Sequence, residues 1–283
     1  MAVLMTAVLF AGCGETDKTS GSDANGGTSV NLSGVVKTGG STSVEKVMLA
    51  LIYQFQNDNG DVKIDYEGNG SGDGITNTKS GLYEIGHSSR ELKTDGSEDG
   101  LDVTAYAIDG IAIVVNKDNG VSNLSKSQIF DIYTGKIKNW SEVGGKDALI
   151  TVITRESGSG TRSAVADIIG LEKKDDDSTK VVEGTNEANN TGAVQTQVAG
   201  NADAIGYMSF SDVDDTKVNV VKYEGVAISE NTLKDGSYKL MREFLLLTNK
   251  DKTLSASAQA FMDFVMSDDG QKIVKDNNLL PIK

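Results

Sequence analysis

The sequence has one cysteine, one histidine and no long apolar run, and each scarcity removes a class of protein. A single cysteine, Cys13, cannot form an internal disulfide. His87 is the only histidine, so there is no His/Cys metal cluster. A hydrolase that uses Ser159 as its nucleophile would need a general base, and an isolated histidine is more often structural than catalytic. The apolar run at residues 1–12 is shorter than the ~20 residues that a transmembrane helix needs.

Basic residues are also in short supply. The 27 Lys and Arg residues are outnumbered by 41 Asp and Glu residues, which gives a formal net charge of −14. Nucleic acids and anionic membrane surfaces are therefore excluded as partners, because both require basic patches. A small anion can still bind to local dipoles and one or two arginines, since exposed charges beyond about 8 Å are largely screened at physiological salt.

The remaining composition is that of a soluble α/β protein. With 283 residues, of which 38% are hydrophobic, the chain is long enough for one large domain or two lobes. Apolar periodicity predicts strands at 35–38, 62–66, 82–86, 103–116 (interrupted at Asp109-Gly110), 149–154 and 204–208, and helices at 44–55, 125–133, 163–169, 191–198 and 258–265. There is no internal repeat and no nucleotide-binding motif.

The octapeptide RESGSGTR at residues 155–162 joins a predicted strand to a predicted helix. Its two glycines allow a sharp bend and a close approach to a ligand. The first N–H groups of the helix are unpaired and the helix dipole makes that end positive. Ser159 and Thr161 add hydroxyl donors, and Arg155 adds a planar guanidinium. This combination suits a small tetrahedral oxyanion, although an N-capped helix after a flexible turn is the simpler alternative.

The same pattern of glycine and hydroxyl residues recurs at two other predicted helix starts. One is GGSTS at residues 39–43 and the other is GNGSGDG at residues 68–74. Each follows a predicted strand, and open α/β sheets bind ligands at the carboxyl ends of their strands. Three such starts in one chain predict that their N-termini converge on one anion.

In this order, the three motifs resemble those of the PstS-type phosphate-binding lipoproteins of bacterial phosphate ABC importers. Further stretches agree, namely IGHSSR at 85–90, DGIAIVVN at 109–116, IYTGKIKNW at 132–140 and AIGY at 204–207. The resemblance extends from about residue 31 to the end of the chain. It implies a two-lobed periplasmic-binding-protein-like fold (type II) with a ligand cleft between lobes joined by a hinge. Lobe 1 would comprise 31–108 with 240–283, and lobe 2 would comprise 109–239.

The resemblance also implies a ligand, a partner and a set of contacts. The ligand would be inorganic phosphate, held without catalytic residues, metal or cofactor and delivered to the permease subunits of the importer. The implied phosphate-binding residues are Thr42, Ser43, Ser71, Ser89, Arg155, Ser159, Gly160 and Thr161. Arg90 and Asp73 are further candidates, and Arg90 either reaches the anion or braces a loop through a carboxylate. The alternatives are a binding protein for another tetrahedral oxyanion and a phosphate-ester hydrolase.

Ser89 departs from the best-known pattern of the resembled family, which has an aspartate at this position, although other members have Ser-Ser-Arg. The aspartate accepts a hydrogen bond from the O–H group that phosphate keeps at neutral pH. Sulfate has no proton, so such an acceptor favours phosphate by about 1–3 kcal/mol or more. We expect Ser89 to act as this acceptor through its hydroxyl oxygen, with Asp73 as the second candidate. Glu156 is expected to orient Arg155, a role that an aspartate at position 157 has in the family.

The N-terminal region predicts a lipid anchor. Residues 1–12 are apolar and end in Ala-Gly before Cys13, as in a bacterial lipoprotein signal peptide. No Lys or Arg precedes the run, so the true start of the signal is expected to lie upstream. Residues 13–30 would then be the lipidated cysteine and a flexible tether; an unprocessed apolar tail is the alternative. We expect an extracytoplasmic monomer anchored to the outer face of the cell membrane.

Overall fold

The computed structural model describes residues 32–171 and 186–282. The predictions on residues 1–12, on Cys13 and on the tether therefore lie outside the described residues. Within these ranges strands and helices alternate, as the sequence predicted for an α/β protein. No helix in the described ranges is long and apolar enough to cross a membrane.

Paired strands connect two hydrophobic cores, in the order β2-β1-β3-β10-β4-β8-β6-β7. The first half contains β1 (Gly34–Gly40), α1 (Glu45–Asp58), β2 (Val62–Gly68), α2 (Ser71–Ser80), β3 (Ile85–Ser88), β10 (Met241–Asn249), α7 (Ala256–Val265), α8 (Asp268–Asp276) and β11 (Leu280–Pro281). The second half contains β5 (Asn123–Leu124), α3 (Lys126–Tyr133), η1 (Trp140–Val143), β6 (Thr151–Arg155), α4 (Gly160–Ile169), β7 (Asn186–Ala188), α5 (Thr191–Ala199), β8 (Ala204–Ser209), η2 (Phe210–Asp212), β9 (Val218–Tyr223) and α6 (Glu230–Lys234). The long strand β4 (Leu101–Asn116) belongs to both halves.

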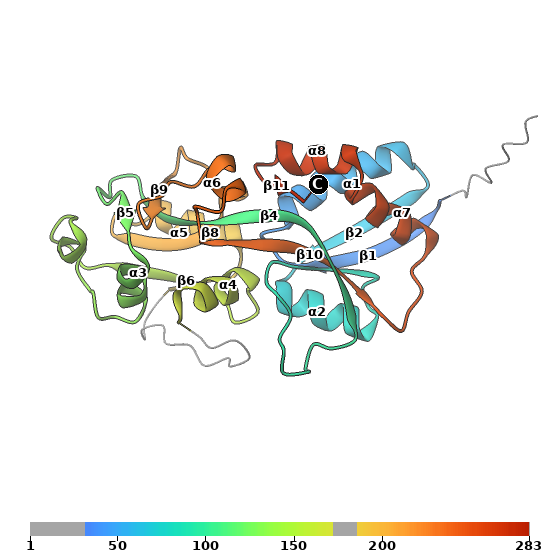
Figure 1. Cartoon of the computed structure of the whole chain (residues 1–283), viewed down its shortest axis with the longest axis horizontal. Helices are drawn as coiled ribbons and strands as arrows, with labels where there is room; N and C mark the ends of the chain where they lie inside the picture. The colour runs from blue at the N-terminus through green and yellow to red at the C-terminus, as the bar shows by residue number, and fades with distance from the viewer. Residues whose placement is uncertain (1–31, 172–185, 283) are drawn as a thin grey trace, which may run out of the picture. The chain divides into compact units, whose positions relative to one another are not determined.

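The first core forms around the predicted apolar face of α1. Its members recur at steps of three and four and are all buried, namely Val47, Met48, Leu51, Ile52 and Phe55. The ring of Phe55 packs edge-on against Phe261 of α7, with centroids 5.3 Å apart. Figure 1 shows α1, α7 and α8 on one side of β1 and β2, and α2 on the other. The start of α1 therefore lies at the carboxyl end of β1, where the first predicted glycine-hydroxyl motif is.

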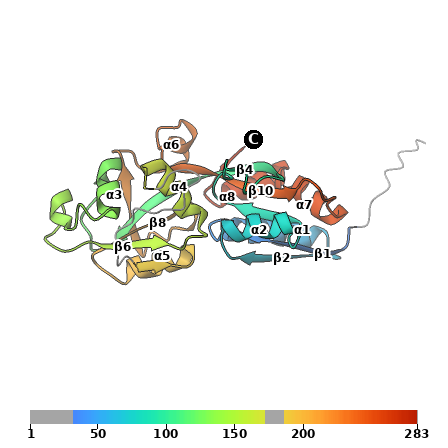
Figure 2. The ribbon, with the colours of Figure 1, turned by 90° about the horizontal axis from the view of Figure 1, so that it is seen from below.

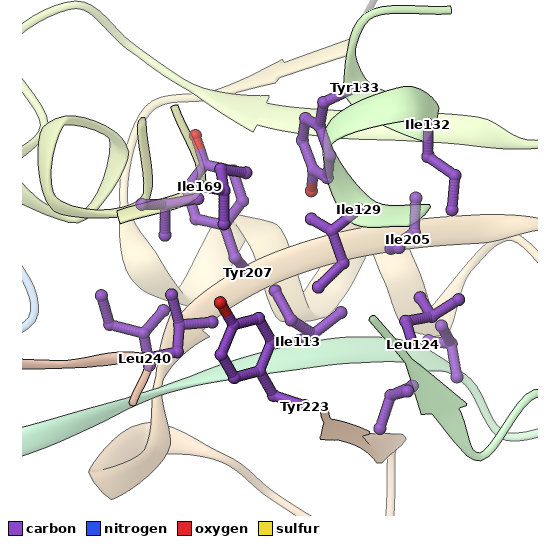
Figure 3. Close-up of a cluster of buried hydrophobic side chains, with 14 of the residues drawn as sticks. Ile113, Leu124, Ile129, Ile132, Tyr133, Ile169, Ile205, Tyr207, Tyr223 and Leu240 are labelled. Atoms are coloured by element: carbon purple, nitrogen blue, oxygen red, sulfur yellow. The ribbon is translucent and has the colours of Figure 1, made fainter. Parts of the chain in front are cut away.

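The second core surrounds β4 and β8 on both faces. Alternate β4 residues point to opposite sides, so Ile111 and Ile113 join one cluster while Ala112 and Val114 join another. Figure 2 shows α3 and α4 on one side of β6 and β8 and α5 on the other. In the larger cluster, Ile113 lies among residues of α3, β8 and β9 (Figure 3). Burial on both faces explains why residues 111–115 of β4 are all apolar.

The predicted interruption of the long strand at Asp109-Gly110 is wrong. β4 runs through both residues and instead changes partner there: residues up to Gly110 pair with β10, and residues from Ile111 pair with β8. Gly110 lies in close packing rather than in a turn, because an added Cβ would lie 2.2 Å from Cδ1 of Ile228 and that side chain would have to move. A glycine in a strand can thus mark a close approach of another segment instead of a break.

Four helices start at the carboxyl ends of parallel strands. α1 follows β1, α2 follows β2, α4 follows β6 and α5 follows β7. Strands β1, β2 and β3 are parallel in the first half, as are β6, β7 and β8 in the second. The free N–H groups and the positive dipole ends of these helices are therefore available to a ligand at the strand ends.

Candidate anion-binding site

Hydroxyl groups from the starts of α1, α4 and α5 meet in one buried cluster. The Oγ of Ser43 lies 2.8 Å from Oγ1 of Thr161 and 3.2 Å from Oγ1 of Thr191. The Oγ1 of Thr42 is also 3.2 Å from that of Thr191. All four residues are buried. Three helix N-termini, brought together from both halves of the chain, therefore present their side-chain donors at one place.

Arg155 forms the charged centre of this cluster. Its guanidinium donates to Thr42 Oγ1 at 3.0 Å through Nη2 and to Thr191 Oγ1 at 3.4 Å through Nη1. Nε and Nη2 also donate to the two carboxylate oxygens of Glu156, each at 2.7 Å. The Arg155 side chain is 1% exposed and that of Glu156 is 22% exposed. A bidentate pair of this kind fixes the plane of the guanidinium, which places Glu156 where the sequence expected the orienting carboxylate.

Three serines form a second, adjoining group. Ser41 Oγ donates to Ser89 Oγ at 2.8 Å. Ser71 Oγ lies 3.3 Å from Ser89 Oγ and accepts the Ser89 N–H at 3.1 Å. All three are buried. They come from the start of α1, the start of α2 and the residue after β3, so they line the first half's side of the site.

A second buried arginine lies behind these serines. Arg242 donates to Ser89 Oγ at 3.3 Å through Nη1, and its Nε and Nη2 donate to Asp109 Oδ2 at 3.1 and 2.9 Å. Ser209 donates to the other oxygen of Asp109 at 2.8 Å. Burial raises the pKa of Asp109, and the charge of Arg242 and these hydrogen bonds oppose that shift. The pair joins β4 to β10 at the point where β4 changes partner.

Close backbone approach brings the two groups together. An added Cβ on Gly160 would lie 2.2 Å from Ser71 Oγ and 2.6 Å from Ser89 Oγ. The N–H of Gly72 donates to the carbonyl of Gly158 at 3.1 Å, which links the start of α2 to the loop before α4. Ser159 caps α4 by accepting the N–H of Arg162 at 3.2 Å. A side chain at position 160, the first residue of α4, would therefore displace the hydroxyls of Ser71 and Ser89.

Two of the predicted candidates lie apart from the site. Arg90 makes a bidentate contact with Glu98 at 2.8 and 2.6 Å, the loop-bracing geometry. Asp73 is exposed in the first turn of α2. The other predicted residues come together as described, namely Thr42, Ser43, Ser71, Ser89, Arg155, Ser159, Gly160 and Thr161.

Four residues of the site were missed by sequence reasoning: Ser41, Asp109, Thr191 and Arg242. Thr191 carried a usable signal, because Thr191-Gly192 opens a predicted helix after a short polar stretch, as the other motifs do. Ser41 stood inside a quoted motif but was not selected. Asp109 also stood inside a quoted stretch, but its pairing with Arg242 had no local signal, since the two are 133 residues apart and meet only in the fold.

The single histidine is held away from the hydroxyl cluster. His87 is fully buried in β3, and its Nε2 lies 2.6 Å from Thr38 Oγ1. Burial lowers the pKa of His87 to about 3, so the ring is neutral at physiological pH. Its hydrogen bond thus goes to Thr38 rather than to a serine of the site. Among the described residues, no cluster of three His, Cys, Asp or Glu side chains could hold a metal ion.

Known proteins share both the sequence and the arrangement. A family model for the PBP superfamily domain matches residues 17–269. The chain is 33% identical over 288 residues to the phosphate-binding protein PstS of Bacillus subtilis, covering 99% of this chain and 91% of that protein. A phosphate ABC transporter substrate-binding protein of Clostridium perfringens, solved with bound phosphate, aligns with a TM-score of 0.83 and 41% identity over 88% of this chain and 100% of that chain. An ABC-type phosphate transport receptor of Vibrio cholerae aligns with a TM-score of 0.73 and 31% identity, over 88% of this chain and 100% of that chain.

Proposed function

Because the chain belongs to the PBP superfamily and, within it, to the PstS-type phosphate-binding proteins, we propose that it binds inorganic phosphate and delivers it to the permease of an ABC importer. The family and the two-lobed type II fold predicted from the sequence are thereby confirmed. The chain is a binding protein and not an enzyme, in keeping with its family.

The observation that supports this proposal most directly is the convergence of donors around Arg155. The guanidinium and the hydroxyls of Thr42, Ser43, Thr161 and Thr191 form one connected set of hydrogen bonds. A tetrahedral anion offers acceptor oxygens in several directions, so it can replace the contacts that these donors make with one another. Charged hydrogen bonds of this kind contribute about 1.5–3 kcal/mol each.

Isothermal titration with phosphate, arsenate, sulfate and molybdate tests the ligand. We expect saturable one-site binding of phosphate, with sulfate and molybdate weaker. If molybdate or sulfate bound more tightly than phosphate, the proposed ligand would be that oxyanion instead of phosphate. Turnover of a chromogenic phosphate ester by the same preparation would support the hydrolase alternative instead.

The domain boundaries form part of the proposal. Lobe 1 would comprise 31–108 with 240–283 and lobe 2 would comprise 109–239, with β4 and β10 as the connecting strands. β4 changes partner after Gly110, and the pairing of β10 is irregular between Phe244 and Leu245. Both observations support a hinge in the middle of these two strands. Small-angle scattering should give a smaller radius of gyration with phosphate than without it. Equal radii at saturating phosphate would argue against closure of the lobes.

The location is proposed from the sequence alone. Cys13 would be the lipidated residue of a monomer held on the outer face of the cell membrane, where its partner permease takes up the phosphate. With a complete signal peptide supplied, Cys13→Ala should move the protein from the membrane fraction to the soluble extracytoplasmic fraction. Retention in the membrane fraction would remove the lipid anchor from the proposal.

A further inference from the structure

The hydroxyl of Ser89 can act only as a hydrogen-bond donor towards a further partner, because both of its lone pairs already accept hydrogen bonds. A serine hydroxyl has one proton to donate and two lone pairs with which to accept. Ser41 donates to Ser89 Oγ at 2.8 Å, and Nη1 of Arg242 donates to the same atom at 3.3 Å. Both lone pairs are thus in use, and the proton of Ser89 remains for donation.

The donor role of Ser89 also determines the role of Ser71 in the hydrogen bond between them. The two oxygens are 3.3 Å apart. Because Ser89 has no lone pair left with which to accept, Ser89 is the donor in this contact and Ser71 the acceptor. Ser71 Oγ also accepts the Ser89 N–H at 3.1 Å. With both of its lone pairs occupied, Ser71 must direct its own proton away from Ser89. Gly160 at the start of α4 lies next to both hydroxyls, since an added Cβ would meet them at 2.2 and 2.6 Å.

The hydrogen-bond directions of Ser89 and Ser71 are set by the buried ion pair of Arg242 and Asp109. Arg242 has only donors, so it can never accept from Ser89. Asp109 holds two of its nitrogens at 3.1 and 2.9 Å, which leaves Nη1 aimed at Ser89. The side chains of Arg242 and Asp109 are 4% and 0% exposed, so solvent cannot substitute for either.

We propose that Arg242 is a positioning residue that, held by Asp109, occupies a lone pair of Ser89 and so leaves Ser89 and Ser71 only their protons to offer to a bound anion. When an anion binds next to the two hydroxyls, the proton of Ser89 turns from Ser71 Oγ to an oxygen of the anion. This rests on the proposed phosphate function and reverses the role expected for Ser89 from the sequence, where it was the acceptor of the ligand's proton. Any preference for phosphate over sulfate then has a source other than Ser89, because a donor serves both anions equally well.

Ser89→Ala separates donor from acceptor. The affinities for phosphate and for sulfate are measured by titration and competition at a pH where both ligands are dianions, so their charges are equal. Loss of one donor to a charged ligand should weaken phosphate binding roughly 10- to 100-fold and leave the phosphate-to-sulfate ratio within about threefold. If the parent rejects sulfate, the variant should reject it too. Unchanged phosphate affinity, or sulfate binding gained by the variant, would overturn the proposal.

The role of Arg242 is tested through Ser89 in a double-mutant cycle. Removing Arg242 alone would leave Asp109 buried and unpaired, so the pair is neutralised together as Asp109→Asn with Arg242→Gln. If Arg242 acts through Ser89, this change should weaken phosphate binding several-fold in the parent and much less in the Ser89→Ala background. Equal losses in the two backgrounds would contradict the positioning role, since a merely structural effect does not depend on Ser89.

The matched control is the neighbouring bidentate pair of Arg90 and Glu98. It is likewise an arginine held by two hydrogen bonds to one carboxylate, with 11% exposure of each side chain, but the Arg90 side chain contacts its own loop rather than the serines. Arg90→Gln with Glu98→Gln should leave phosphate affinity and its dependence on Ser89 unchanged. A parent that binds no phosphate would refute the proposed function itself, which keeps the two failures distinct.

Discussion

Two buried arginines serve the site, and they are held in different ways. Arg155 pairs with its neighbour in sequence, Glu156, whose side chain is 22% exposed. Arg242 pairs with Asp109, 133 residues away, and that carboxylate is fully buried. The first pair lies in a loop between a strand and a helix, whereas the second joins two strands that run between the halves. The same chemical pair is therefore local and partly exposed in one place, and long-range and fully buried in the other.

The degree of burial determines what each pair contributes. A carboxylate that still reaches water can lose its partner at little cost, because solvent replaces the contact. A fully buried charge has no solvent to replace its partner, so removing one member of the pair leaves the other desolvated and uncompensated. Changes at Arg155 should thus appear mainly in ligand affinity, and changes at Asp109 mainly in stability.

The largest effect is expected for Asp109→Asn. This change leaves the guanidinium of Arg242 buried without its counter-charge, and should lower the free energy of unfolding by about 3–5 kcal/mol. Urea unfolding of the parent and variant measures it. Glu98→Gln, in the less buried pair with Arg90, is the control and should cost less. A loss below about 1 kcal/mol for Asp109→Asn would remove the distinction between the two arginines.

Arg155→Ala should act on the ligand instead. Removing a charged partner from a closed site costs about 2–5 kcal/mol, equivalent to roughly 30- to several-thousand-fold in phosphate affinity. Titration calorimetry gives the affinity, and circular dichroism establishes that the variant is folded. A folded variant that binds phosphate within threefold of the parent would show that Arg155 is not the main charge at the site.

His87 should make the stability of the first half sensitive to acid. It lies two residues before Ser89, and burial lowers its pKa to about 3 from an ordinary value near 6.5. The neutral ring is favoured in the folded state, so stability is complete above about pH 6.5 and is lost as the pH falls towards 3. Between pH 7 and pH 5 the loss should be about 2 kcal/mol. His87→Gln should remove that part of the pH dependence of urea unfolding; identical slopes would contradict it.

Glu156→Gln should have the smallest effect on stability, about 1–2 kcal/mol, because water reaches position 156 although Arg155 itself is buried. The carboxylate is partly exposed, and Arg155 keeps its contacts with Thr42 and Thr191. Urea unfolding of the Glu156→Gln and Asp109→Asn variants, measured together with the parent, compares the two stability losses directly. A loss as large as that of Asp109→Asn would mean that the two pairs are equivalent.

The contrast also explains what the sequence could and could not predict. Arg155, Ser159, Gly160 and Thr161 form one stretch, so their common role is visible in the order of residue types. The helix face of α1 was equally visible, because burial follows a period of three to four residues. Arg242 stands in an ordinary strand between Met241 and Glu243, and nothing in that stretch indicates Asp109 as its partner. Contacts that depend on which strands pair, such as this one and the partner change at Gly110, require the fold.

The first hydrophobic core draws on both ends of the described chain. Val36 and Ile85 pack with Phe244, Phe261 and Val274, although the second half of the fold lies between them in the sequence. During synthesis, the strands β1, β2 and β3 therefore leave the ribosome long before β10, α7 and α8 exist. The first core cannot close until β10, α7 and α8 have been made, whereas β4 to β9 can assemble earlier. A nascent chain of this kind stays open along its N-terminal third, and a truncation before α7 would leave that third without its core.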